Sequence, residues 1–170
     1  EKIRELLQQK RGLFLIAGAS GAGKTTTMAA LTGALLKESG KKITVLEENT
    51  EYLYHTEEEN TSLLVQRETA SHTKTMANGI KTALLQDSDV ITVSGLDGAE
   101  SLEAAVRAVE MGRLVLAIVD AEDSFLAIET LLSYVDERNV AKMQQRLANA
   151  LIGGMSQQLL PRENGTGRVA

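Results

Sequence analysis

The amino-acid sequence predicts an α/β fold in which a mostly parallel sheet is covered by helices on both faces. Short, continuous apolar runs, such as residues 13–17 and 114–119, are typical of strands that are buried on both faces. Longer amphipathic stretches alternate with these runs and short loops join them, which favours strand–helix–strand units with parallel pairing. The 170 residues contain no repeat, low-complexity tract or linker, so we expect a single domain over residues 1–170.

The expected strands are short and consist mainly of apolar and β-branched residues, which strands favour. They lie at residues 13–17, 42–46, 63–65, 90–93 and 114–119. Between the second and third strands, residues 47–62 are acidic and are typical of a loop. Along the chain, a helix therefore separates each expected strand from the next, except between the second and third strands. Parallel strands require such crossover connections.

The expected helices are longer and have apolar residues at helical spacing. They lie at residues 1–9, 25–37, 73–86, 100–111, 124–134 and 137–152. In the first helix Ile3, Leu6 and Leu7 fall on one side, as the helical period predicts. Gly40 follows the second helix and Gly112 the fourth, at positions where glycine commonly ends a helix.

Composition limits the classes of function. The net charge of −5 argues against nucleic acid as a partner, because binding phosphate backbones requires clustered Lys and Arg. The absence of Cys excludes disulfides and thiolate metal sites, and it fits a cytoplasmic location. No apolar run approaches the ~20 residues of a membrane span, so we expect no direct membrane insertion.

The stretch GASGAGKTTT, residues 18–27, matches the pattern G-x-x-x-x-G-K-[ST] and lies between an expected strand and an expected helix. Its glycines let backbone N–H groups approach phosphate oxygens, and the helix N-terminus adds the positive end of a dipole. Lys24 can reach the β- and γ-phosphates, and the Thr25 hydroxyl can coordinate Mg²⁺. The sequence therefore predicts a P-loop that binds ATP and Mg²⁺, with Thr25 as the metal ligand. The predicted cofactor-binding residues are Gly18, Ala19, Ser20, Gly21, Ala22, Gly23, Lys24, Thr25 and Thr26.

Further segments carry a resemblance that covers nearly the whole chain. They are GLFLIAGASGAGKTTTMAAL (12–31), ITVLEENTEYLY (43–54), VQRETASHT (65–73), ALLQDSDVITV (83–93), EMGRLVLAIVDAEDS (110–124), SQQL (156–159) and GRVA (167–170). In this order they resemble the motor ATPases of type IV pili and type II secretion. The resemblance implies a RecA-like P-loop NTPase domain. It also implies that the chain is a fragment without the family's N-terminal domain and C-terminal extension.

The same resemblance implies the partners. Subunits of this family assemble into six-membered rings, so we expect a hexamer of this protein with itself or with related motor subunits. It further implies contact with the inner-membrane platform proteins of a pilus or a secretion system. We therefore expect a cytoplasmic protein, which such partners could hold at the inner membrane.

The departures from the family pattern fall outside the P-loop. In the family, the strand corresponding to residues 90–93 ends in Gly-Glu, and this Walker B Glu orients the attacking water; here Ser94 and Gly95 stand in its place. The other departures are at polar positions: Asp97 for an Arg, Arg113 and Asp120 for two His, and Lys81 and Leu85 for two Arg. The phosphate-binding half of the site is therefore intact, and the water-activating half is altered.

ATP can bind without a water-orienting carboxylate, but hydrolysis then lacks assistance that is typically worth about 10²–10⁴ in rate. Glu47 and Glu51 match the two glutamates of the family's acidic box and are the candidate catalytic residues. Glu48 and Asp97 are further carboxylates that could take the missing role. An acidic run of this kind is otherwise a solvated loop, and that alternative stays open.

Two functions follow from these observations. The first is an ATP-binding motor domain that couples ATP binding and hydrolysis to pilus or secretion movement. The second is a nucleotide-binding, weakly or non-hydrolysing paralogue that acts as a regulatory or partner subunit. The sequence leaves both open, because it does not establish which carboxylate replaces the Walker B Glu at Gly95.

Overall fold

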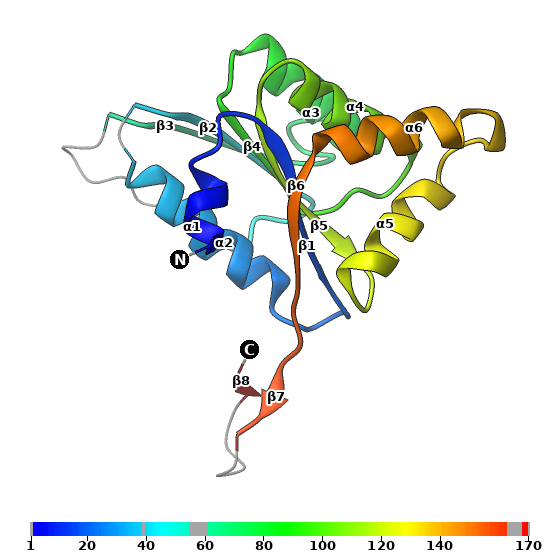
Figure 1. Cartoon of the computed structure of the whole chain (residues 1–170). Helices are drawn as coiled ribbons and strands as arrows, with labels where there is room; N and C mark the ends of the chain where they lie inside the picture. The colour runs from blue at the N-terminus through cyan, green and yellow to red at the C-terminus, as the bar shows by residue number, and fades with distance from the viewer. Residues whose placement is uncertain (1, 39, 55–60, 163–167, 170) are drawn as a thin grey trace.

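In a computed structural model that describes residues 2–38, 40–54, 61–162 and 168–169, six strands form one parallel sheet with helices on both faces (Figure 1). The strands are β1 (Gly12–Gly18), β2 (Lys42–Glu47), β3 (Leu63–Glu68), β4 (Val90–Val93), β5 (Leu114–Asp120) and β6 (Leu151–Ser156). Their order across the sheet is β3-β2-β4-β5-β1-β6, and each neighbouring pair is parallel. The predicted α/β fold is confirmed.

The helices divide between the two faces of the sheet. They are α1 (Lys2–Leu7), α2 (Lys24–Leu36), α3 (Met76–Leu85), α4 (Ala99–Glu110), α5 (Ser124–Ser133) and α6 (Glu137–Ala150). On one face Phe14 and Ile16 of β1 pack with residues of α1 and α2. On the other face Leu13 and Leu15 pack with residues of α3, α4, α5 and α6. Alternate side chains of β1 therefore fill two separate cores, as the period of a strand requires.

The burial of β1 fixes the position of the P-loop. All seven residues of this strand are buried, and it lies between β5 and β6. Full burial of a Leu, Ile or Phe side chain stabilises a fold by roughly 1.5–3 kcal/mol, so this strand is held firmly between the two cores. Gly18, its last residue, is thereby placed at the carboxyl edge of the sheet, where parallel α/β sheets bind ligands.

Side-chain caps set where three of the helices begin. Thr75 accepts a hydrogen bond from the Asn78 N–H group, so α3 begins at Met76 and not at residue 73 as predicted. Asp123 accepts hydrogen bonds from two N–H groups at the start of α5. Asp136 accepts one from the Arg138 N–H group at the start of α6. Each such cap is worth about 1 kcal/mol of stability.

The prediction for the last part of the chain was wrong. Residues 151 and 152 belong to β6 and not to the preceding helix, and this strand was not among the predicted ones. Its centre is Gly153-Gly154, a pair that gives no strand signal. A Cβ at Gly153 would lie 3.1 Å from Leu6 Cδ1, so this glycine allows α1 to lie close to the strand. A small hairpin of β7 (Leu160–Pro161) and β8 (Arg168–Val169) follows.

Candidate functional site

The P-loop connects β1 to α2, and its glycines have the conformations that the motif requires. The φ angle is 76° at Gly21 and 83° at Gly23, in the left-handed region that favours glycine. A Cβ at Gly18 would lie 2.6 Å from the carbonyl oxygen of Gln157, so a side chain there would collide with the backbone after β6. The loop therefore brings the N-terminus of α2 to the sheet edge as an anion-binding site.

Lys24, the first residue of α2, is buried with its ammonium group turned toward the loop. Its Nζ atom donates hydrogen bonds to the carbonyl oxygens of Gly18 and Ala19, each at 2.8 Å. Nζ also lies 2.8 Å from Oδ1 of Asp120, at the end of β5. Because an ammonium group has three protons, these three acceptors occupy all of them.

Gln157, which was not among the predicted site residues, links the P-loop to the segment that follows β6. The buried side chain of Gln157 donates a hydrogen bond to the Ala22 carbonyl oxygen at 2.7 Å. Its Oε1 atom accepts one from the Thr27 hydroxyl at 2.6 Å. The Gln157 N–H group bonds to the Ala17 carbonyl oxygen at 2.8 Å. Gln157 therefore holds the end of β1, the P-loop and the first turn of α2 in one arrangement.

The segment after β2 is fastened over the start of α2. The Tyr52 hydroxyl lies 2.9 Å from the hydroxyl of Thr26, and its carbonyl oxygen accepts a hydrogen bond from Gln66 at 2.8 Å. The Thr50 N–H group donates to a carboxylate oxygen of Glu68 at 2.8 Å. Within the predicted acidic loop, residues 48–54 are thus held against β3, and Tyr52 also contacts the P-loop helix; residues 55–60 lie outside the described residues.

A cavity of about 260 Å³ lies beside Thr25, at the carboxyl ends of β2, β4 and β5. Its lining residues are Thr25, Glu47, Glu48, Asn49, Glu51, Ser94, Gly95, Leu96, Asp97, Ile118, Asp120 and Tyr134. The structure therefore brings the candidate catalytic residues Glu47 and Glu51 together with the predicted metal ligand. It also places Gly95 on the cavity wall, where a Cβ would meet no heavy atom within 4 Å.

The carboxylate of Glu47 has an unusual environment in this cavity. Burial raises its pKa, a hydrogen bond from Gln66 opposes this rise, and the negative charges of Glu51 and Glu68 add to it. Its Oε2 atom is buried and has no hydrogen-bond partner among the described residues. The negative charge of Glu47 is therefore not balanced by enough hydrogen bonds or positive charges, and a cation in the cavity would stabilise it.

The donor set beside Thr25 fits Mg²⁺. This ion prefers hydroxyl, carboxylate and phosphate oxygens, and it is commonly held by one or two protein groups together with substrate phosphates. Within the described parts of the chain, no three His, Cys, Asp or Glu side chains are grouped so that they could hold a metal ion by themselves. The residues therefore fit an ion that arrives with a nucleotide, with Thr25 and a neighbouring carboxylate as its protein ligands.

Arg113, which departs from the family pattern just before β5, lies far from the P-loop. Arg113 precedes β5, at the opposite end from Asp120, and it forms an ion pair with Asp87. Asp89, 4.0 Å from the Arg113 guanidinium, accepts a hydrogen bond from the Lys42 N–H group at 2.8 Å. These aspartates hold Arg113 and the start of β2 at the amino-terminal edge of the sheet. Of Arg113 and Asp120, only Asp120 therefore lies near the P-loop.

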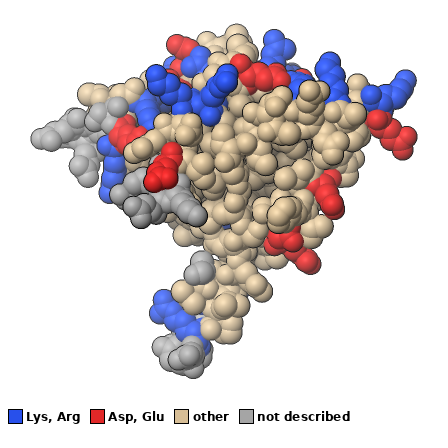
Figure 2. Space-filling view, viewed as in Figure 1, with Lys and Arg blue, Asp and Glu red and all other residues tan. Residues whose placement is uncertain are grey.

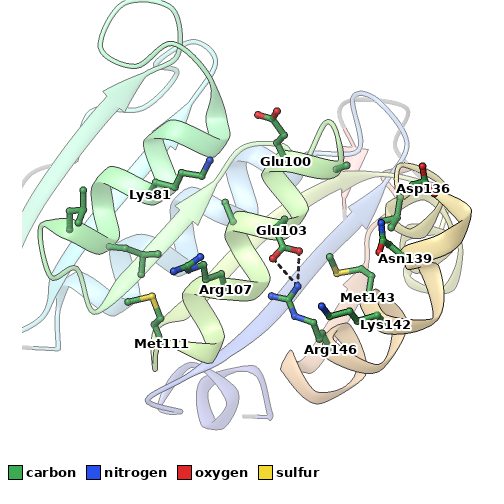
Figure 3. A pocket seen from close by; sticks show the side chains of 15 residues that line it. Lys81, Glu100, Glu103, Arg107, Met111, Asp136, Asn139, Lys142, Met143 and Arg146 are labelled. Atoms are coloured by element: carbon green, nitrogen blue, oxygen red, sulfur yellow. Dashed lines mark hydrogen bonds and ion pairs between the residues drawn. The ribbon is translucent and has the colours of Figure 1, made fainter.

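A larger cavity, of about 840 Å³, lies between α3, α4 and α6 (Figure 3). Arg146 of α6 joins α4 there: its Nη1 atom lies 2.6 Å from Glu103 and its Nε atom 2.7 Å from Glu110. Hydrogen bonding to Arg146 lowers the pKa of Glu110. Figure 2 shows basic and acidic residues side by side along this edge of the molecule. None of the described residues that line the cavity belongs to the P-loop, so this is not the phosphate site.

Nearly the whole chain is similar in sequence to known proteins. A family model described as "Type II/IV secretion system protein" matches residues 1–167. The uncharacterised protein YggR of Escherichia coli (strain K12) is 37% identical over 98% of this chain and 50% of its own length. The type IV pilus ATPase PilU of Pseudomonas aeruginosa is 31% identical over 100% of this chain and 44% of its own length.

A solved structure is also similar in both fold and sequence. The crystal structure of the pilus retraction motor PilT with bound ADP superimposes with a TM-score of 0.91 and 32% identity, over 99% of this chain and 48% of that chain. The chain thus spans about half the length of the relatives it matches. Among the described residues, no helix is long and apolar enough to cross a bilayer.

Proposed function

The chain belongs to the type II/IV secretion system protein family, and from this premise we propose that it is the nucleotide-binding domain of a pilus or secretion motor ATPase. It would couple the binding and hydrolysis of Mg·ATP to movement of the machine. The observation that carries the proposal is the buried Lys24 at the N-terminus of α2, beside loop glycines with the required conformations. The names of PilU and of PilT, which was crystallised with ADP, support a nucleotide as the ligand.

The chain's own residues suggest how the nucleotide would be held. N–H groups of the P-loop and the Lys24 ammonium would bind the β- and γ-phosphates. The Thr25 hydroxyl, with a carboxylate of the adjoining cavity, would hold Mg²⁺, which neutralises charge on the phosphate oxygens when bound. Glu47 and Glu51 line the same cavity and are the proposed groups for orienting the attacking water.

One observation favours the second function, a weakly hydrolysing regulatory or partner subunit. Gly95 presents no side chain to the cavity at the place where the family has its water-orienting Glu. Phosphoryl transfer depends mainly on positioning and charge stabilisation, so binding can persist while turnover is slow. Such a subunit could still pass on ATP-dependent motion, because binding alone can shift a two-state interface.

We place this domain in a six-membered ring with itself or with related motor subunits, in contact with platform proteins at the inner membrane. The proposed location is the cytoplasm. These assignments rest on family membership and on relatives whose names describe a type IV pilus ATPase and a type II secretion system protein.

The experiment compares nucleotide binding with phosphate release in the purified full-length protein. Saturating Mg·ATP is expected to raise the unfolding midpoint, since ligand at about 100 times Kd adds about 2.7 kcal/mol of stability. Lys24→Ala should abolish this gain, whereas Lys42→Ala, which removes a remote lysine of β2, should retain it. A wild-type midpoint that ignores both Mg·ATP and Mg·ADP would show that the proposal is wrong. Binding with slow phosphate release would favour the partner-subunit function.

A further inference from the structure

Asp120 is the carboxylate that contacts the P-loop lysine. It pairs with Gly18 across β5 and β1, so the register of the sheet itself brings its side chain to Lys24. Glu47, Glu51 and Asp97 line the neighbouring cavity, but the ion pairs within the described parts of the chain include none between them and Lys24. Asp120 therefore acts on the P-loop in a way that the other carboxylates do not.

We propose that Asp120 competes with the nucleotide's phosphates for Lys24 and thereby makes nucleotide binding depend on Mg²⁺. This assignment rests on the function proposed above and goes beyond it, because it names the residue that sets the metal dependence of binding. Asp120 is here a residue that controls affinity, distinct from the groups proposed to orient water.

The competition follows from the three acceptors around Lys24. Its ammonium protons go to the carbonyl oxygens of Gly18 and Ala19 and to the Asp120 carboxylate, each at 2.8 Å. A phosphate oxygen can bind Lys24 only by replacing one of them. The carbonyl oxygens belong to the fixed backbone of the loop, whereas the Asp120 side chain is 81% exposed and can rotate away. Phosphate therefore replaces Asp120.

The metal dependence follows from the charge of the displaced carboxylate. After rotation, the Asp120 carboxylate remains at the edge of the phosphate site, and like charges at such separations repel. Asp120 lines the cavity that also contains Thr25, the proposed Mg²⁺ ligand. A divalent cation there would attract both the phosphates and this carboxylate, directly or through water. Asp120 thus weakens nucleotide binding when Mg²⁺ is absent and has little effect on binding when Mg²⁺ is present.

The test is calorimetric titration of the full-length protein with ATP, in excess magnesium chloride and in EDTA. Asp120→Asn keeps the size of the side chain and removes its charge. It is expected to tighten ATP binding in EDTA about fivefold, the scale of a partly exposed ion pair. Binding in magnesium should change by less than about twofold, because the cation already offsets the carboxylate. Asp120→Ser should give the same pattern.

Glu129→Gln is the matched control. Glu129 is an exposed carboxylate of α5 that does not line either cavity beside the P-loop, and its loss changes the net charge of the protein equally. It should alter the ratio of the two dissociation constants by less than about twofold, since the solvent screens it. If Asp120→Asn leaves this ratio unchanged, or weakens binding in EDTA, the role of Asp120 is overturned while the proposed function stands. A wild-type protein that binds ATP in neither buffer would overturn the proposed function, and this assignment with it.

Discussion

Replacing Gln157 by Ala is expected to destabilise the fold by about 2–4 kcal/mol, because two polar groups of the P-loop region lose their partner. The Ala22 carbonyl oxygen loses a donor at 2.7 Å, and the Thr27 hydroxyl loses an acceptor at 2.6 Å. Leaving the buried Ala22 carbonyl oxygen unpaired costs about 1–3 kcal/mol, and the half-buried Thr27 hydroxyl adds about 1 kcal/mol. For a domain of this size, such a loss lowers the unfolding midpoint by roughly 5–15 °C.

The assay is chemical unfolding of the wild type and three variants, followed by titration with Mg·ATP. Gln158→Ala is the matched control, because this neighbour is exposed and should change stability by less than about 0.5 kcal/mol. Gln157→Glu keeps the acceptor for Thr27 but turns a carboxylate oxygen toward the Ala22 carbonyl oxygen. Its loss of stability should shrink as the pH falls, since a protonated carboxyl group can donate to that carbonyl oxygen.

Nucleotide binding should follow the same order. A displaced P-loop loses the alignment of its N–H groups, so Gln157→Ala should weaken binding while Gln158→Ala does not. The reasoning is refuted if Gln157→Ala costs less than about 0.5 kcal/mol, or if both glutamine variants lose equal stability.

Two further predictions concern the cavity beside Thr25. Glu47→Gln should raise the unfolding midpoint at neutral pH: the pKa of Glu47 is raised in the folded state, so its charged form opposes folding above about pH 4.5, and the gain should vanish at lower pH. An equal gain in the exposed Glu48→Gln control would contradict the role of burial. Gly95→Glu should increase phosphate release about tenfold, short of the full 10²–10⁴, because neighbouring positions also differ from the family. Gly95→Gln supplies the same bulk without the charge; if it is equally fast, or if wild-type protein is already as fast as Gly95→Glu, the missing carboxylate is not the reason for slow turnover.

Local signals predicted the parts of the fold that local interactions determine. The apolar run of β1, the glycines after it and the helix that begins at Lys24 are adjacent in sequence, and each has a strong pattern of its own. The alternation of strands and helices then predicted the parallel sheet. The sequence marked Glu47 and Glu51 as candidates by their residue type and position but did not establish their distance from Thr25; the structure shows that both line the cavity beside it, at the carboxyl edge of the sheet.

Contacts between distant residues could not be predicted in the same way. Gln157 lies 135 residues from Ala22, and it follows β6, a strand whose glycine pair carries no strand signal. Tyr52 reaches Thr26 through a loop whose path is set by packing and not by propensity. Asp120 was recognised as a departure from the family, but its contact with Lys24 depends on the register between β1 and β5, which the sequence does not reveal.

The departures at Gly95 and Asp120 are related through the sheet. Gly95 follows the end of β4 and Asp120 is the last residue of β5; these two strands are adjacent, and Val93 pairs with Ala117. Compared with the family pattern, one carboxylate is absent after β4, and another is present at the end of β5. Both positions line the cavity beside Thr25, but the Asp120 carboxylate lies 2.8 Å from Lys24 Nζ and is therefore engaged with the phosphate-binding lysine. A carboxylate at position 95 should thus increase the rate of hydrolysis, because it would orient the attacking water. Removing the carboxylate of Asp120 should change the affinity for nucleotide, because Asp120 competes with the phosphates for Lys24.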